Sequence, residues 1–143
     1  NGGSTADGNY YNWSAAVAMN NTSSLTASGT NVTTSICPKG WTLPQNGTTG
    51  KTYANLGAAY GLPTTNGSSS TAYQTLEQSP LNFVRAGRVY SGSLGSQGSG
   101  GGYWSSTVDS NRYAYDLYYD RRDYNPQNGN LRSVGFSVRC VAR

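Results

Sequence analysis

The two cysteines, Cys37 and Cys140, constrain the folding of this chain more than any other feature of its sequence. They lie far apart, and neither belongs to a CxxC motif. A disulfide between them would close a long loop and stabilise the fold by about 4 kcal/mol or more, because the unfolded chain would lose entropy. Two buried thiols are the alternative interpretation. We favour the disulfide, which implies export to an oxidising compartment.

The length of 143 residues corresponds to about one domain, predicted here over residues 9–143 after a flexible lead-in over residues 1–8. Gly, Ser, Thr, Asn and Tyr are abundant and charge is low at 11%, which favours a loop-rich extracellular or β-containing domain. The 12 Tyr and 3 Trp argue against disorder. No apolar run reaches membrane-spanning length, so we expect no membrane insertion by this domain. The expected location is extracellular or at the cell surface.

The first half of the chain predicts one strand and two short helices. Residues 9–17 combine aromatic and small apolar residues and predict a first strand with Trp13 as a core anchor. Residues 51–61 have apolar side chains at helical spacing and end on Gly61, a helix stop. Residues 69–80 predict a second helix that ends before its proline.

The second half predicts short strands joined by turns. We expect a hairpin around Ala86–Gly87 and a surface loop over residues 93–102. Three further strands are predicted over residues 102–107, 113–119 and 135–141. Trp104, in the first of these strands, is assigned to the core.

Charged residues of both signs alternate in the last third of the chain. Three Arg residues at 112, 121 and 122 are interleaved with four Asp residues at 109, 116, 120 and 123. No unmixed basic stripe exists for a phosphate backbone to follow, so nucleic acid is not an expected partner.

The sequence contains no histidine, which removes the usual general base, the common catalytic triads and nearly every zinc site. A glycosidase-type pair would need one carboxyl that stays protonated, but the Asp residues near the end of the chain each have an Arg nearby that would keep them ionised. We therefore expect neither an enzyme nor a cofactor. Asp and Asn oxygens could bind calcium, but no EF-hand spacing is present, and a solvated polar loop is the favoured interpretation. No metal site is predicted.

Three short motifs carry a resemblance to known families: CPKGWTLP over Cys37–Pro44, YWSST over Tyr103–Thr107 and GFSVRCV over Gly135–Val141. They resemble the bacterial surface domains called the Fibrobacter major paralogous domain, and they are similar to the variable proteins of diversity-generating retroelements. The resemblance implies an α+β, C-type-lectin-like fold related to the formylglycine-generating enzyme, with two short helices, small antiparallel sheets and long loops. The thiols and metal ligands of that enzyme's active site are missing here, so the resemblance implies its fold without its activity.

In retroelement variable proteins, adenine-directed mutagenesis rewrites selected codons near the C-terminus, and the altered residues form a ligand-binding surface. Diversified AAY codons yield mainly Asn, Tyr, Asp, Ser, Arg and Gly. The segment from about 108 to 134 consists largely of these residues. The resemblance thus implies a variable segment followed by a constant framework, of which Gly135–Cys140 is part.

Positions in this segment that do not match the family framework are the expected ligand contacts. Asp116, Tyr118 and Asp120 have period-two spacing and would project from one side of a strand. Leu117 and Tyr119 would face the other side. The full expected ligand-binding set is Asn111, Tyr113, Asp116, Tyr118, Asp120, Arg121, Arg122, Asp123, Tyr124, Asn128, Gly129, Asn130, Leu131, Ser133 and Val134.

The composition of the segment agrees with a binding role, because Tyr supplies rigid contact area and Ser, Gly and Asn supply adaptable hydrogen bonds, as in antibody loops. Arg112, Arg121 and Arg122 would fit as charged anchors. Tyr115 and Tyr119 are instead assigned to the core.

The sequence therefore predicts a diversified, receptor-like binding protein on a bacterial or phage surface, such as a phage tail or a pilus tip. Its expected partner is a protein ligand on another cell or surface. Two alternatives stay open: a non-diversified cell-surface or pilus-associated structural module, and a carbohydrate-binding module that uses exposed Tyr or Trp side chains.

Overall fold

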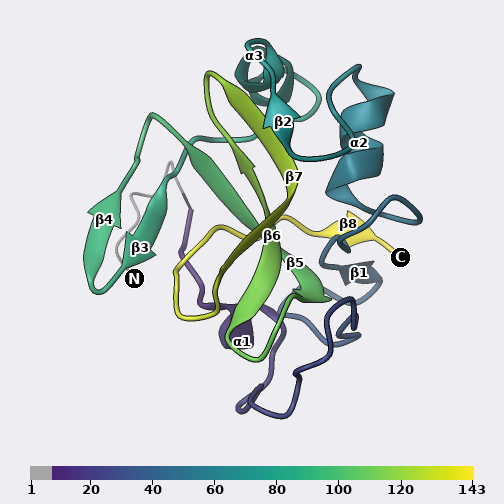
Figure 1. Cartoon of the computed structure of the whole chain (residues 1–143), viewed down its shortest axis with the longest axis vertical. Helices are drawn as coiled ribbons and strands as arrows, with labels where there is room; N and C mark the ends of the chain where they lie inside the picture. Colours follow the sequence, from purple (N-terminus) through teal and green to yellow (C-terminus); the bar gives the residue numbers. More distant parts are fainter. Residues whose placement is uncertain (1–7) are drawn as a thin grey trace.

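The computed structural model describes residues 8–143, with three long strands crossing its centre (Figure 1). The predicted flexible lead-in over residues 1–8 lies outside the described residues, except for Gly8. The helices are α1 (Trp13–Ala16), α2 (Tyr53–Ala59) and α3 (Ala72–Glu77). The strands are β1 (Trp41–Thr42), β2 (Gly67–Ser68), β3 (Arg88–Tyr90), β4 (Ser93–Gly95), β5 (Gly101–Val108), β6 (Tyr113–Tyr119), β7 (Asp123–Leu131) and β8 (Val141–Ala142).

The central sheet has the strand order β2-β7-β6-β5, and its strands pair antiparallel. Its register places Trp104 opposite Asp116 and Gly102 opposite Tyr118. Two further antiparallel pairs, β1–β8 and β3–β4, complete the sheets in the described residues. The expected α+β class with short helices and antiparallel sheets is confirmed.

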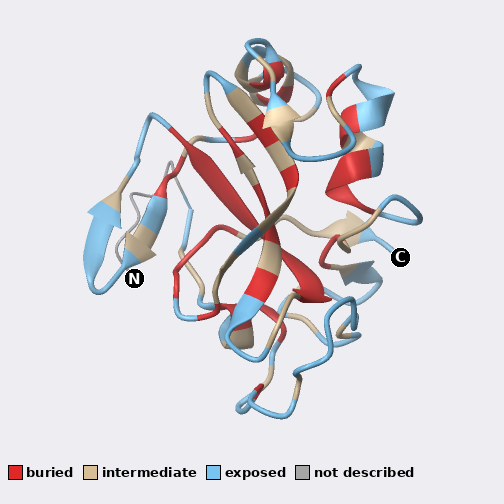
Figure 2. Ribbon diagram, viewed as in Figure 1, coloured by how far each residue is buried: buried red, intermediate tan, exposed pale blue. Residues whose placement is uncertain are grey.

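The central sheet separates two hydrophobic clusters, because neighbouring residues of a strand point to opposite faces. Trp104 belongs to the first cluster, with Trp13 and Phe136, and the adjacent Tyr103 belongs to the second. Leu117 and Tyr119 lie in that second cluster. Figure 2 shows β5 buried along its length and β6 and β7 buried in part. The core assignments of Trp13, Trp104 and Tyr119 are confirmed.

The predicted strand over residues 9–17 is wrong, because α1 occupies its middle. The side chain of Asn12 accepts a hydrogen bond from the backbone of Ala15 at 2.9 Å, which caps a helical turn. The two predicted helices correspond to α2 and α3. Gly61 follows α2 with a positive φ of 71°, as expected of a helix stop. The described residues thus contain three helices where two were expected. No helix within residues 8–143 has the length and apolar character needed to span a membrane.

The hairpin predicted around Ala86–Gly87 lies five residues further along the chain. Its turn is formed by Ser91 and Gly92 between β3 and β4, with φ values of 49° and 77°. Two consecutive positive φ values are typical of the primed turns that match strand twist. The predicted surface loop over residues 93–102 is accordingly wrong at both ends, where β4 and the start of β5 lie.

The predicted disulfide is confirmed: Cys37 and Cys140 are bonded across a sequence separation of 103 residues. It lies close to the pairing of β1 with β8. The strand predicted over residues 135–141 is wrong as a continuous element, because Gly135, Phe136 and Ser137 form isolated bridges to three different segments. Only its last residue, Val141, belongs to a strand.

Candidate ligand-binding site

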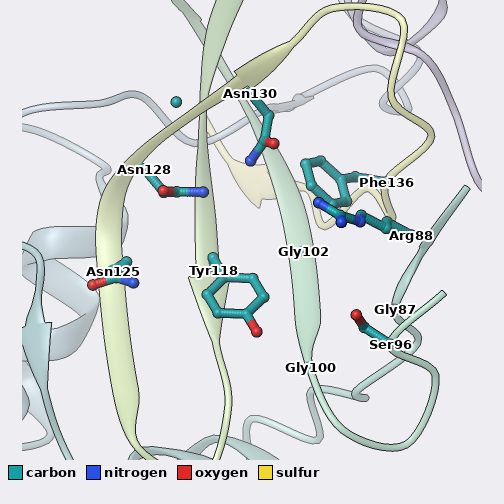
Figure 3. A pocket seen from close by; sticks show the side chains of 11 residues that line it. Gly87, Arg88, Ser96, Gly100, Gly102, Tyr118, Asn125, Asn128, Asn130 and Phe136 are labelled. Atoms are coloured by element: carbon teal, nitrogen blue, oxygen red, sulfur yellow. The ribbon is translucent and has the colours of Figure 1, made fainter. Parts of the chain in front are cut away.

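A polar pocket of about 330 Å³ lies on the face of the sheet beside the β3–β4 hairpin (Figure 3). Tyr118 projects into it from β6, and Asn125, Asn128 and Asn130 come from β7. Antiparallel pairing brings these side chains together, since Tyr118 lies opposite Asn125. The complete lining consists of Gly87, Arg88, Ser96, Gly100, Gly102, Tyr118, Asn125, Asn128, Gly129, Asn130 and Phe136.

Two glycines, Gly100 just before β5 and Gly102 within it, let aromatic rings lie directly on the backbone. A Cβ on Gly102 would lie 2.3 Å from the Phe136 ring, and one on Gly100 would lie 2.9 Å from the hydroxyl of Tyr118. Both distances are far below van der Waals contact, so these positions accept only glycine without rearrangement. The glycine run is a packed part of the pocket rather than a solvent loop.

Asp116 lies beneath the two amides of β7 and is fully buried. Asn130 donates from Nδ2 to its Oδ1 at 3.0 Å, and Asn128 donates from Nδ2 to its Oδ2 at 3.1 Å. Because its amide nitrogen is turned to the carboxylate, the amide oxygen of Asn130 lies on the side of Phe136 (Figure 3). Asp116 therefore orients pocket side chains without meeting a ligand itself.

Burial raises the pKa of Asp116 to about 7, although the amides of Asn130 and Asn128 partly oppose the shift. The expectation that a nearby Arg keeps this carboxyl ionised is wrong. Its hydrogen-bond partners are neutral amides, which stabilise a charge less than a guanidinium would.

Asp120 closes the β6–β7 turn. Its Oδ1 accepts hydrogen bonds from the backbone N–H groups of Arg122 at 2.7 Å and Asp123 at 2.9 Å. Tyr118 donates its hydroxyl to Oδ2 at 3.1 Å. Partial burial raises the pKa of Asp120, but these hydrogen bonds lower it by more. Burial, followed by the charge of Asp120, raises the pKa of Tyr118 to about 12. Asp120 thus fixes the turn and the Tyr118 hydroxyl.

The structure brings together four residues of the expected ligand-binding set in this pocket: Tyr118, Asn128, Gly129 and Asn130. Other members lie elsewhere. Asn111, Leu131 and Ser133 line a separate, open hollow. The β6–β7 turn contains the exposed Arg121 and Arg122, and the half-buried Asp123 follows them. Tyr113 is exposed at the start of β6.

The expected surface exposure is wrong for Asp116, Tyr124 and Val134, which are all buried. Tyr124 donates its hydroxyl to the carbonyl of Tyr53 at 2.6 Å and packs in the second cluster. Val134 packs in the first cluster. Conversely, Tyr115 was assigned to the core and is half-buried.

Arg88, Ser96 and Phe136 were not predicted as pocket residues, because they precede or follow the variable segment. Nor was β7 predicted as a strand, because its Asn and Gly residues are typical of turns. Backbone pairing of β7 with β6 and β2 overrides this preference. The side chain of Asn125 also accepts a hydrogen bond from the backbone of Gly67 in β2 at 3.1 Å. One available signal was the run of three glycines directly before Tyr103, which suggests close backbone packing.

Comparison of the chain with protein-family models, curated proteins and solved structures finds no match. Within residues 8–143, no three His, Cys, Asp or Glu side chains gather as a metal site would require. The pocket offers a ligand amides, hydroxyls and one guanidinium on paired strands.

Proposed function

We propose that this protein is a diversified, receptor-like binding protein with a C-type-lectin-like fold, displayed on a bacterial or phage surface. One observation carries the proposal. Four positions expected to vary, Tyr118, Asn128, Gly129 and Asn130, come from two strands and line one pocket. Leu117, which alternation was expected to send to the other side of the strand, is buried. The resemblance of the three sequence motifs supplies the mechanism of diversification.

The sheet suits this role because its strands pair through backbone groups, which are the same for every side chain. Pocket side chains can therefore change while the ladder persists. Tyr and Asn at these positions provide rigid aromatic area and adaptable hydrogen bonds. Binding requires no bond-making step, and we infer a non-catalytic protein whose partner is a protein on another cell or surface. The disulfide is compatible with an extracellular location.

A carbohydrate ligand is the second candidate. Most pocket side chains, among them Arg88, Ser96, Asn125 and Asn130, offer hydrogen-bonding groups, and sugar hydroxyls would match these. A glycan array probed with the wild-type protein and Tyr118→Ala distinguishes the two ligand classes. Tyr118-dependent glycan binding would favour this candidate.

The experiment that tests diversification is sequencing of this gene and its flanking DNA from many cells of the source population. We expect substitutions at Tyr118, Asn128 and Asn130, with Leu117 and Gly135–Cys140 spared, beside an Asn-codon-rich template repeat and a reverse transcriptase gene. Uniform or silent variation without either neighbour would contradict the proposal and favour the structural module.

A further inference from the structure

A second hollow, the α2 groove, lies between α2 and the β1–β8 pair, on the side of the molecule away from the β3–β4 hairpin (Figure 1). It has a volume of about 500 Å³ and shares no lining residue with the polar pocket. A site here would leave the polar pocket open.

The wall and floor of the α2 groove are mainly apolar. Trp41, on β1, is 46% exposed and forms part of the wall. Phe83 is buried in the floor, and Leu56 and Leu81 are half-buried beside it. A half-exposed Trp beside a hollow is the typical geometry of an interface anchor, because burial of its ring against a partner removes a large apolar area from water.

Both charged residues in the lining of the α2 groove are cations, Lys51 and Arg139. Lys51 donates to the carbonyl oxygen of Ala142, and Arg139 donates to that of Asn82 at 3.3 Å. The Arg139 guanidinium also lies 4.4 Å from the centre of the Phe83 ring. These contacts hold the cations in place without neutralising them, since the ion pair found within residues 8–143 joins other side chains.

The disulfide makes this hollow rigid. Cys140 is part of its lining and is bonded to Cys37, four residues before Trp41. The β1–β8 pairing places Trp41 opposite Ala142. A preformed hollow binds more tightly than one that must be ordered on binding.

We propose that the α2 groove is a docking site for an acidic, extended peptide segment of a partner protein. An apolar side chain of that segment fills the hollow against Trp41, and flanking carboxylates pair with Lys51 and Arg139. Charge complementarity selects this occupant, because carboxylates attracted to Lys51 and Arg139 speed the encounter, disfavour basic segments and orient the bound segment. A membrane surface fits less well, because Phe83 is buried and Leu56 and Leu81 are half-buried, which leaves only part of the apolar lining accessible to a flat surface.

This site does not depend on the variable pocket and goes beyond the proposed function.

The test selects peptides from a random library for binding to the wild-type protein. Peptides that also bind the double variant Trp41→Ser/Lys51→Gln are removed. We expect the remaining peptides to carry Phe, Leu or Trp next to Asp or Glu. They should bind the double variant at least about tenfold more weakly, and their affinity should fall as salt rises. Fluorescence anisotropy of the labelled peptides measures both effects.

Two control variants test whether the loss of binding is specific to the α2 groove. Lys39→Gln removes an exposed cation that does not line the α2 groove, and Tyr90→Ser removes an aromatic that is 47% exposed on β3. Both should bind the selected peptides as the wild type does, and thermal unfolding checks that every variant is folded.

Three outcomes overturn the proposal. The first is that no sequence is enriched over the double variant, and the second is that groove-dependent peptides lack carboxylates. The third is that the protein, in a manner that depends on Trp41 and Lys51, sediments with phosphatidylglycerol vesicles while the selected peptides do not compete. That third result would assign the surface to a membrane.

Discussion

The carboxyl of Asp116 is the clearest case in this protein of one residue whose surroundings decide its role. Its position on β6, opposite Asn128, places it under two amide side chains and away from water. Burial without a cation makes the charged form costly, so the folded state favours the protonated acid below about pH 7.

The first prediction concerns the pH dependence of stability. The folded-state pKa of Asp116 is about 7 against an ordinary value of 3.8, so the folded protein retains a proton that the unfolded chain has released. The free energy of unfolding should therefore fall by about 1.4 kcal/mol per pH unit as the pH rises from about 4 to about 7. Urea unfolding across this range measures the slope.

Asp116→Asn should abolish this slope, because an amide does not titrate. Asp120→Asn is the control, because the pKa of Asp120 is lowered in the folded state. Its contribution to the free energy of unfolding is therefore lost only as the pH falls below 3.8, the ordinary pKa of the carboxyl. It should retain the wild-type slope. An unchanged slope in Asp116→Asn would show that this carboxyl titrates normally.

The second prediction concerns Gly102, on which the Phe136 ring lies. Gly102→Ala should destabilise the protein by about 1–3 kcal/mol and displace the ring, because the new Cβ would lie 2.3 Å from it. Gly95→Ala, where a Cβ meets nothing within 4 Å, should change stability by about 0.5 kcal/mol or less. Chemical denaturation of both variants tests the pair. Equal effects would contradict the close packing.

At the scale of elements, β6 and β7 combine a fixed backbone ladder with side chains of two kinds. Tyr119 lies opposite Tyr124, and both are buried in the second cluster. Tyr118 lies opposite Asn125, and both line the polar pocket. One strand pair thus contributes to the core on one face and to the candidate site on the other.

The third prediction compares a tyrosine from each face. Tyr124→Ala should cost about 3–5 kcal/mol, because it leaves a cavity in the core. Tyr118→Ala should cost about 1 kcal/mol or less, since its ring is half-buried at a pocket. It should, however, alter what the pocket binds. Denaturant midpoints give the two costs, and a larger cost for Tyr118→Ala would reverse the assignment of faces.

For the whole molecule, the Cys37–Cys140 bond closes a loop that contains every strand except β8. Because the two cysteines are 103 residues apart, the bond removes many conformations from the unfolded chain. A single long closure therefore contributes substantially to stability.

The fourth prediction is that reduction of the disulfide lowers the free energy of unfolding by about 4–5 kcal/mol, the value for a loop of about 100 residues. Denaturation with and without reductant measures it, and Cys37→Ser/Cys140→Ser separates loss of the bond from side effects of the reductant. Mass spectrometry that finds two free thiols in the untreated protein would refute the bond itself.

The sequence predicted correctly those features that depend only on neighbouring residues in the chain. The helix stop at Gly61, the strand over 113–119 and the buried Trp104 follow from backbone geometry, alternation and size. The strand β7 could not be read in this way. Asn and Gly favour turns locally, and only pairing with β6 and β2 holds residues 123–131 extended.

The sequence by itself determined the helices α2 and α3, the disulfide and the alternation that sends Leu117 and Tyr119 to the core, because these depend on helical spacing, cysteine chemistry and period-two geometry. Only the tertiary structure decided which polar residues reach a ligand site. Asp116 and Tyr118 obey the same alternation, yet one is covered and the other lines a pocket. Burial depends on what packs above a residue, and the covering side chains of Asn128 and Asn130 come from another strand.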